Sequence, residues 1–345
     1  MKRPRLLAVV GATALLAGCG TATTSASPTS RPATQPVSQA RPAAALAADD
    51  TIPTCPQDGK SAVASIDPGS ITTSASSWPS GSTMADIKER GKLIAGVAGD
   101  VTLWGSRDPF TGKLAGFDVD VVKRVAQELG LDPNRDVEYK VINFAQRLPK
   151  LQEHEVDLVA DTMTMNCARW FGTDANKTNY INFSTEYYRA GQKLLLRSDS
   201  DATNVEDLGD ATVCTTEGST SLENIKDLVK STVVVSDVGE CLVKFQEGEA
   251  TAITSDDTVL AGFAKQDPYA KVMAGDPLNI VPYGLGTASD AADLTQFVNV
   301  VLEDMRRDGT LDRLYTKWMS GSGTQPDVPP AVYGRTEAEL TKDRG

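Results

Sequence analysis

Residues 116–129, GFDVDVVKRVAQEL, hold the clearest helical pattern in the chain. Apolar side chains recur there at the spacing of one helix face, at Val121, Val122, Val125 and Leu129. Gly130 follows, a residue type that commonly ends helices. The apolar run 92–98 before this segment indicates a buried strand. The stretch therefore predicts an amphipathic helix that follows a strand in an α/β fold.

The same alternation continues on both sides of this helix and then restarts. Strands are predicted at 92–98, 137–144, 156–163, 211–215, 232–236 and 252–255, and helices at 118–129, 145–153, 221–229, 241–246, 257–264, 291–307 and 311–319. Such alternation indicates mostly parallel sheets. The restart predicts two α/β lobes, with the chain crossing near Arg197 and returning near Pro282. The natural ligand site is the cleft between them.

These crossings divide the folded part of the chain. Residues 51–196 are predicted to form the first part of lobe 1, residues 197–282 to form lobe 2, and residues 283–320 to return to lobe 1 as helices. The segment 321–345 is rich in proline and charge, and we expect it to be a C-terminal tail outside the core.

The N-terminus has the features of an export signal. Lys2, Arg3 and Arg5 precede a short apolar stretch, 6–16, which is too short to span a bilayer. It leads into Leu-Ala-Gly-Cys ending at Cys19, which resembles a bacterial lipobox. We expect residues 1–18 to be a lipoprotein signal peptide and Cys19 to be lipidated. The alternative is an ordinary secretory signal with a chance cysteine.

Residues 19–50 are composed mainly of Ala, Thr, Ser, Pro and Gln and contain no aromatic residue. Such a segment cannot bury enough apolar surface to fold, so it predicts a disordered tether between the lipid and the folded body.

Charge and histidine content exclude several classes of protein. Lys plus Arg is 34 and Asp plus Glu is 46, so the net charge is −12, which disfavours nucleic-acid binding. Loss of the three cationic residues of the signal gives 31 − 46 = −15. His154 is the single histidine, so a two-histidine zinc site is excluded. Composition favours binding over catalysis.

The five cysteines fit an exported protein with disulfides. Cys19 aside, the remaining Cys55, Cys167, Cys214 and Cys241 allow three connectivities, and no C-x-x-C spacing indicates a metal. We favour Cys214–Cys241, which joins a predicted strand to a predicted helix and leaves Cys55–Cys167 to hold the N-terminal segment.

The constrained positions of 116–129 match the signature of bacterial extracellular solute-binding proteins of family 3, the amino-acid receptors of ABC importers. The resemblance extends from Gly91 to Met319. It implies a two-lobe, type II periplasmic-binding-protein-like clamp with a two-strand hinge, which closes on one amino acid. It implies neither an enzyme nor a cofactor or metal.

The resemblance also implies roles for residues of the first lobe. Val156-Asp157 followed by Thr162, Thr164 and Arg169 is similar to the family strand that enters the cleft. Arg169 would pair with the ligand α-carboxylate, for which a planar guanidinium suits. Thr164 would assist it, and Thr162 would contact the α-ammonium. A surface arginine is the alternative for Arg169.

In the second lobe, residues 217–221 (EGSTS) resemble the family loop that precedes a helix and binds an anion through its N–H groups. Ser219 and Thr220 would therefore complete the α-carboxylate clamp. Asp256 follows a predicted strand where the family keeps an aspartate for the α-ammonium, although the adjacent Asp257 is the alternative.

Ligand selectivity is expected to depend on Arg107 and Arg147. A second carboxylate on the ligand would need a second cation. Arg107 lies in WGSRDPF, residues 104–110, and Arg147 lies in a Gln-Arg-Leu-Pro turn similar to that of glutamate/aspartate-binding members. L-Glutamate and L-aspartate are therefore the expected ligands, with the amides weaker. Both arginines could instead form surface ion pairs.

The expected partners are a small-molecule amino acid and an ABC permease. The expected location is the outer face of the cytoplasmic membrane, where a monomer is held by its lipid. A subunit that senses the same ligand for a membrane protein is one alternative. An enzyme similar to cyclohexadienyl dehydratases is another, and an ammonium-binding aspartate disfavours it.

Overall fold

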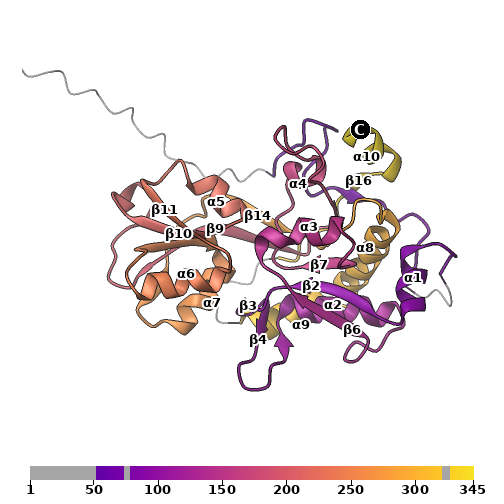
Figure 1. The fold of residues 1–345 in the computed structure, drawn as a ribbon, viewed down its shortest axis with the longest axis horizontal. Coiled ribbons are helices and arrows are strands. Elements are labelled where there is room, and N and C mark those ends of the chain that lie inside the picture. The colour runs from indigo at the N-terminus through magenta and orange to yellow at the C-terminus, as the bar shows by residue number, and fades with distance from the viewer. Residues whose placement is uncertain (1–51, 74–77, 321–326) are drawn as a thin grey trace, which may run out of the picture. The chain divides into compact units, whose positions relative to one another are not determined.

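The computed structural model describes residues 52–73, 78–320 and 327–345 (Figure 1). The predicted signal peptide 1–18, the lipidation site Cys19 and the tether 19–50 lie outside the described residues. No helix within the described ranges is long and apolar enough to cross a membrane.

The first sheet builds lobe 1. In spatial order its strands are β6 (Val137–Val141), β2 (Leu93–Val97), β7 (Leu158–Ala160), β15 (Gly286–Thr287) and β8 (Asn182–Phe183). The first three are parallel, and β15 pairs antiparallel with both β7 and β8. A small sheet carries β3 (Asp100–Val101), β4 (Gly105–Arg107) and β5 (Leu114–Ala115).

The helices of lobe 1 include the amphipathic helix that was predicted from residues 116–129. They are α1 (Thr83–Arg90), α2 (Phe117–Glu128), α3 (Arg147–Gln152), α4 (Cys167–Phe171), α8 (Ala292–Arg307) and α9 (Thr310–Met319), with a 3-10 turn η1 (Phe144–Gln146). The predicted apolar stripe of α2 is buried, and α2 packs against α8, α9 and the sheet. Burial of that stripe is the main reason the segment is a stable helix here.

The second sheet builds lobe 2. Its order is β11 (Ser231–Val235), β10 (Thr212–Thr216), β12 (Ala252–Asp256), β9 (Tyr188–Arg197) and β13 (Ala270–Val272), with β14 (Ile280–Tyr283) also pairing β9. The helices are α5 (Thr220–Ile225), α6 (Val238–Gln246) and α7 (Asp257–Gln266), with a 3-10 turn η2 (Glu206–Leu208). Figure 1 shows these helices grouped with β10 and β11, apart from α1, α2 and α8.

Two antiparallel strands, β9 and β14, connect the lobes, with Pro282 opposite Arg189. The chain returns through β14, which contains Pro282. The crossing expected near Arg197 comes earlier in the structure, because β9 already pairs with β12 from Gln192 onward. We place this crossing at residues 188–191, ahead of Arg197. The apolar run of β9 looks the same in either lobe, so periodicity alone could not locate the crossing.

Both expected disulfides are present. Cys214 of β10 bonds Cys241 of α6, with 5.5 Å between their Cα atoms, and so joins a strand of lobe 2 to a helix that packs on it. Cys55 bonds Cys167, the first residue of α4, with Cα atoms 5.2 Å apart. The second bond fastens the N-terminal segment to lobe 1.

The prediction that residues 321–345 lie outside the core is wrong for the described part of that segment. β16 (Tyr333–Arg335) pairs with β1 (Ser65–Ile66), and α10 (Glu337–Arg344) buries Leu340 in the lobe 1 core. Arg335 is buried, and its Nε donates to Asp58 Oδ2 at 2.7 Å. Composition was misleading because one buried ion pair and one leucine suffice to fix a mostly polar segment.

Replacing Arg335 by alanine should destabilise the protein by about 3–5 kcal/mol, because Asp58 would be left buried without its partner. Arg335 also donates to the Ser61 carbonyl at 3.0 Å and stacks over Trp170 at 4.4 Å. Chemical unfolding would measure the loss. Arg307→Ala removes an exposed ion-pairing arginine and should cost about 0–1 kcal/mol. Equal losses in the two variants would mean that this ion pair is dispensable.

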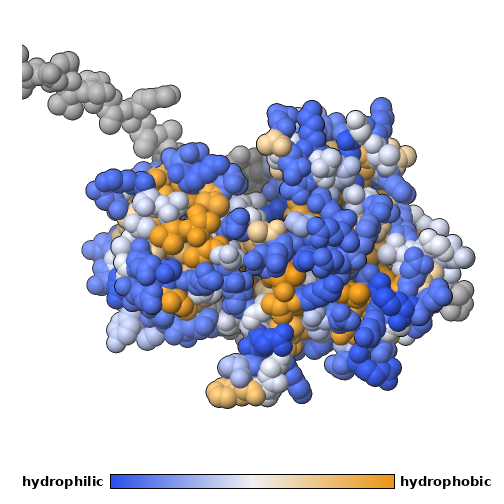
Figure 2. Space-filling view, viewed as in Figure 1, coloured by the Kyte–Doolittle hydropathy of each residue, from blue (hydrophilic) through white to orange (hydrophobic). Residues whose placement is uncertain are grey.

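Apolar side chains are exposed to solvent at one edge of the lobe 2 sheet. Val234 of edge strand β11, Val243 of α6 and Leu228 are all more than 40% exposed. Figure 2 shows apolar surface over the region where β10, β11 and α6 lie in Figure 1. Adjacent apolar side chains on a surface often mark contact with a partner.

Candidate functional site

Arg169 lies at the meeting of the two lobes. Asn166 caps α4 and fixes the turn that carries Arg169. The guanidinium is buried, donating from Nη1 to the Thr164 carbonyl at 2.8 Å and from Nη2 to the Gly218 carbonyl of lobe 2 at 3.1 Å. Burial lowers its pKa to about 9, with nearby Arg147 adding to the effect. An anion bound here would be strongly stabilised.

Arg147 lies beside Arg169 and shares one of its acceptors. A capping box between Asn143 and Gln146 sets the turn before α3. The buried guanidinium donates to three carbonyl oxygens, those of Phe144 at 3.0 Å, Asp161 at 2.9 Å and Gly218 at 3.2 Å. Burial lowers the pKa of Arg147. One lobe 2 carbonyl therefore accepts hydrogen bonds from two lobe 1 arginines.

The loop that contains Gly218 can approach lobe 1 this closely only because Gly218 has no side chain. Its φ is +70°, and a Cβ would lie 2.6 Å from Ala145 Cα. Next to it, Ser219 caps α5: its hydroxyl accepts from Leu222 N at 3.0 Å and donates to the Thr216 carbonyl at 2.6 Å. The Ser219 hydroxyl, expected at the ligand, is thus engaged within its own loop.

The two threonines of the expected clamp meet across the lobes. Thr164 Oγ1 and Thr220 Oγ1 are 3.2 Å apart. Both line a hollow of about 250 Å³ that also includes Ile52 and Pro53 of the N-terminal segment and Ile280 of β14. Arg147, Arg169 and Asp256 do not line this hollow, which therefore lies beside the charged cluster.

Asp256, at the carboxyl end of β12, is buried among groups from both lobes. Its Oδ2 accepts from the Tyr283 hydroxyl at 2.5 Å, and Arg147 and Arg169 are near enough to act on its charge. Burial raises the pKa of Asp256 to about 6, against the lowering effect of Tyr283. Asp257 instead contacts the Gly191 and Thr258 backbones. Of the two, only Asp256 belongs to the arginine cluster.

Thr162 has a strained backbone and a hydroxyl without a partner. Its φ is +43°, which β-branched residues rarely adopt, and its buried Oγ1 makes no hydrogen bond among the described residues. Its N–H donates to Asp118 Oδ2 at 2.9 Å, while Tyr187 OH donates to Oδ1 at 2.6 Å. Burial raises the pKa of Asp118 to about 7.

Asp161 was missed by sequence reasoning. It is fully buried, and neither carboxylate oxygen has a hydrogen-bond partner among the described residues. Burial raises its pKa well above the ordinary value, with Arg147 opposing the rise. The available signal was its position, an acidic residue directly after the apolar strand β7, where α/β folds place ligand contacts.

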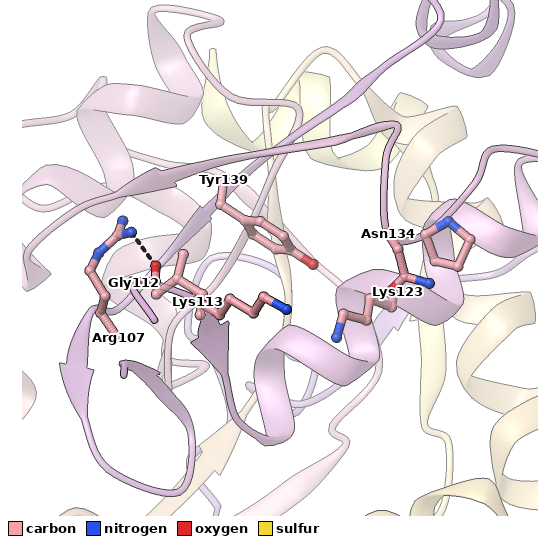
Figure 3. Close-up of a pocket in the computed structure, with 8 residues that line it drawn as sticks. Arg107, Gly112, Lys113, Lys123, Asn134 and Tyr139 are labelled. Carbon is pink, nitrogen blue, oxygen red and sulfur yellow. Dashed lines mark hydrogen bonds between the residues drawn. The ribbon is translucent and has the colours of Figure 1, made fainter. Parts of the chain in front are cut away.

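Arg107 lies away from this cluster. It is exposed on β4, and its Nη1 donates to the Gly112 carbonyl at 2.7 Å. It borders a surface hollow of about 440 Å³ together with Lys113, Lys123 and Tyr139, and none of the residues in the arginine cluster lines that hollow (Figure 3). The structure therefore does not bring Arg107 together with Arg147. The turn after β4 brings the Gly112 carbonyl within hydrogen-bond distance of Arg107, so this side chain bonds its own hairpin.

His154 follows α3 at the surface, where its side chain lies 3.4 Å from Asp290. It is an exposed residue just beyond the helix end.

The comparisons with known proteins agree with this architecture. Residues 93–321 match the model of bacterial extracellular solute-binding proteins, family 3. The ABC transporter glutamine-binding protein GlnH of Bacillus subtilis (strain 168) is 31% identical over 69% of this chain and 84% of its own. Glutamate-binding protein GluB of Corynebacterium efficiens is 30% identical over 66% and 79%.

A solved structure gives the same relationship in three dimensions. The ancestral amino acid-binding protein AncCDT-1, described as a precursor of cyclohexadienyl dehydratase, superposes with a TM-score of 0.60 at 28% identity, over 69% of this chain and 99% of that one. The matched segment covers both sheets and the β9–β14 connection. The chain belongs to the bacterial extracellular solute-binding proteins of family 3.

Proposed function

We propose that this chain is an extracytoplasmic lipoprotein that binds L-glutamate or L-aspartate, and their amides more weakly, and delivers the ligand to an ABC importer. The observation that carries the proposal is the cluster at the lobe junction, in which Arg169, Arg147 and Asp256 are all buried together. An α-amino acid has matching charges, and a buried charge needs a partner.

The cluster supports distinct roles for its members. Arg169 pairs with the α-carboxylate, assisted by Thr164 and by Thr220 at the start of α5. Asp256 pairs with the α-ammonium, and Thr162 contributes its unpartnered hydroxyl. Arg147 provides the second cation for a side-chain carboxylate, and Arg107 has no part in this site. The loop of Ser219 acts through its backbone.

Binding works by closure of lobe 2 on lobe 1. The open form captures the ligand on lobe 1, and lobe 2 then supplies Asp256 and Thr220. The hydrogen bonds from Arg147 and Arg169 to the Gly218 carbonyl link the lobes at the same point. A membrane permease recognises the closed form, and the exposed apolar edge at β11 and α6 is suited to such contact.

Calorimetric titration of the purified full chain in detergent against the twenty amino acids tests the proposal. Tight binding of glutamate and aspartate, with weaker binding of the amides, is the expected result. Preference for a basic or apolar amino acid would refute the acidic specificity, but the proposal that the chain binds an amino acid would stand. Turnover of a cyclohexadienyl substrate without amino-acid binding would favour the dehydratase chemistry named for the precursor structure.

Amino-acid affinity should weaken as the pH falls below about 6. Asp256 has a raised pKa of about 6, so acidification protonates it and removes the negative charge that pairs with the ligand ammonium. The dissociation constant for every amino acid should then rise by up to about tenfold per pH unit. Titrations between pH 4.5 and 7.5 would measure this change. In Asp256→Asn the affinity should be low and this shared pH dependence should be absent.

A further inference from the structure

One carboxyl group in the candidate site is buried without a hydrogen-bond partner in the part of the chain that the structure describes. Asp161 is 0% exposed, and both of its oxygens lack a hydrogen bond among the described residues. Leaving such a group unsatisfied costs free energy, so native proteins rarely do so without a functional reason.

The charged and titratable neighbours of Asp161 come from several elements. Arg147 of α3 donates to its backbone carbonyl, and the charges of Arg147 and Arg169 of α4 act on its carboxyl group. Asp118 of α2 and Asp100 of β3 oppose its ionisation, and it acts in turn on Tyr187. The neighbourhood therefore holds charges of both signs.

These other acids already have donors. Asp118 accepts from Tyr187 OH and Thr162 N, and Asp100 accepts from Gly239 N of lobe 2 at 2.7 Å. The carboxylate oxygens of Asp161 accept from no donor among the described residues, although Asp161 lies beside the arginine proposed to meet the end of the ligand side chain. A ligand side chain that reaches Arg147 therefore also comes within the surroundings of Asp161.

We propose that Asp161 is a specificity residue that contacts the end of the ligand side chain together with Arg147. The inference rests on the function proposed above. Protonated Asp161 donates a hydrogen bond to a side-chain carboxylate. Ionised Asp161 repels that carboxylate but accepts a hydrogen bond from the NH₂ of a side-chain amide. The protonation state of Asp161 thus determines whether the site prefers an acidic ligand or its amide.

The surroundings favour the protonated form of Asp161. Burial raises the pKa of Asp161, and the like charges of Asp118 and Asp100 raise it further, against the lowering effect of the two arginines. As the pH rises through this pKa, the donor is lost and a negative charge replaces it. Glutamate should then lose affinity while glutamine keeps it.

The test is the ratio of the dissociation constants of glutamate and glutamine between about pH 5.5 and 8.5, where the ligand side-chain carboxyl stays ionised. The two ligands share their α-carboxylate and α-ammonium, so the effects of Asp256 cancel in the ratio. We expect the ratio to rise with pH, by at most about tenfold per unit. This measurement on the unaltered chain needs no variant to fold.

Asp161→Asn supplies a donor at every pH and should make the ratio independent of pH. The matched control is Asp118→Asn, which removes a neighbouring buried acid whose pKa is also raised. Because it also removes a like charge, it should keep the pH dependence of the ratio and displace it to lower pH.

The outcomes separate the two proposals. Failure of glutamate and aspartate to bind at any pH would refute the proposed function. Binding of both glutamate and glutamine with a ratio that does not change with pH would overturn the role of Asp161 alone. The same conclusion would follow if Asp161→Asn kept the slope of the unaltered chain.

Discussion

Replacing Arg169 by alanine will remove binding of every amino acid, acidic or neutral. The guanidinium is buried at the lobe junction and is the proposed partner of the α-carboxylate, which all of these ligands carry. Truncating one partner of a buried charge pair costs about 2–5 kcal/mol. The dissociation constants should therefore rise between about 30-fold and several thousandfold.

Titration calorimetry with glutamate, glutamine and asparagine would measure this loss. Arg169 also donates to the Thr164 carbonyl, so unfolding of the variant must be followed in parallel. Arg344→Ala is the matched control, since that arginine is partly buried and also bonds backbone carbonyls, yet it belongs to the C-terminal segment. If both variants bind equally well, Arg169 is a structural residue.

Replacing Arg147 by leucine will weaken acidic ligands far more than amides. Glutamate would bury a second carboxylate without a cation, a loss of about 2–5 kcal/mol, whereas glutamine would lose one hydrogen bond to a charged group, about 1.5–3 kcal/mol. The buried guanidinium also bonds three carbonyls, so both ligands will suffer a shared loss. The measured quantity is therefore the ratio of the two affinities.

Arg107→Ala provides the comparison, because this arginine is exposed and bonds its own hairpin. It should leave both affinities within about 0.5 kcal/mol of the unaltered chain. A selective loss of glutamate binding in Arg107→Ala, with none in Arg147→Leu, would reverse the assignment of the two arginines.

Local pattern predicted the elements of this fold well. The stripe of residues 116–129 became α2, and most of the alternating strands and helices lie within a few residues of their expected positions. Arg169, Thr164, Thr220 and Asp256 are brought to the lobe junction as their motifs implied. Periodicity and motif spacing are local properties, and in an α/β fold they determine which side chains follow strand ends.

Long-range pairing could not be predicted in the same way. Whether Arg107 enters the site depends on how one hairpin turn curls, and whether Arg335 is buried depends on Asp58, which lies far away in sequence. The charges that act on Asp161 come from α2, α3, α4 and β3, which no sequence window contains together. Charge alone cannot distinguish a solvated carboxylate from an enclosed one.

The Cys55–Cys167 bond gives the protein a defined point of mechanical attachment. Any load applied to the chain ahead of Cys55 passes through a covalent bond to Cys167, two residues from Arg169 on the same short helix. The pull thus enters lobe 1 and does not pass through the strands β9 and β14 that connect the lobes. A chain restrained from its N-terminus would hold lobe 1 in place and leave lobe 2 as the free lobe.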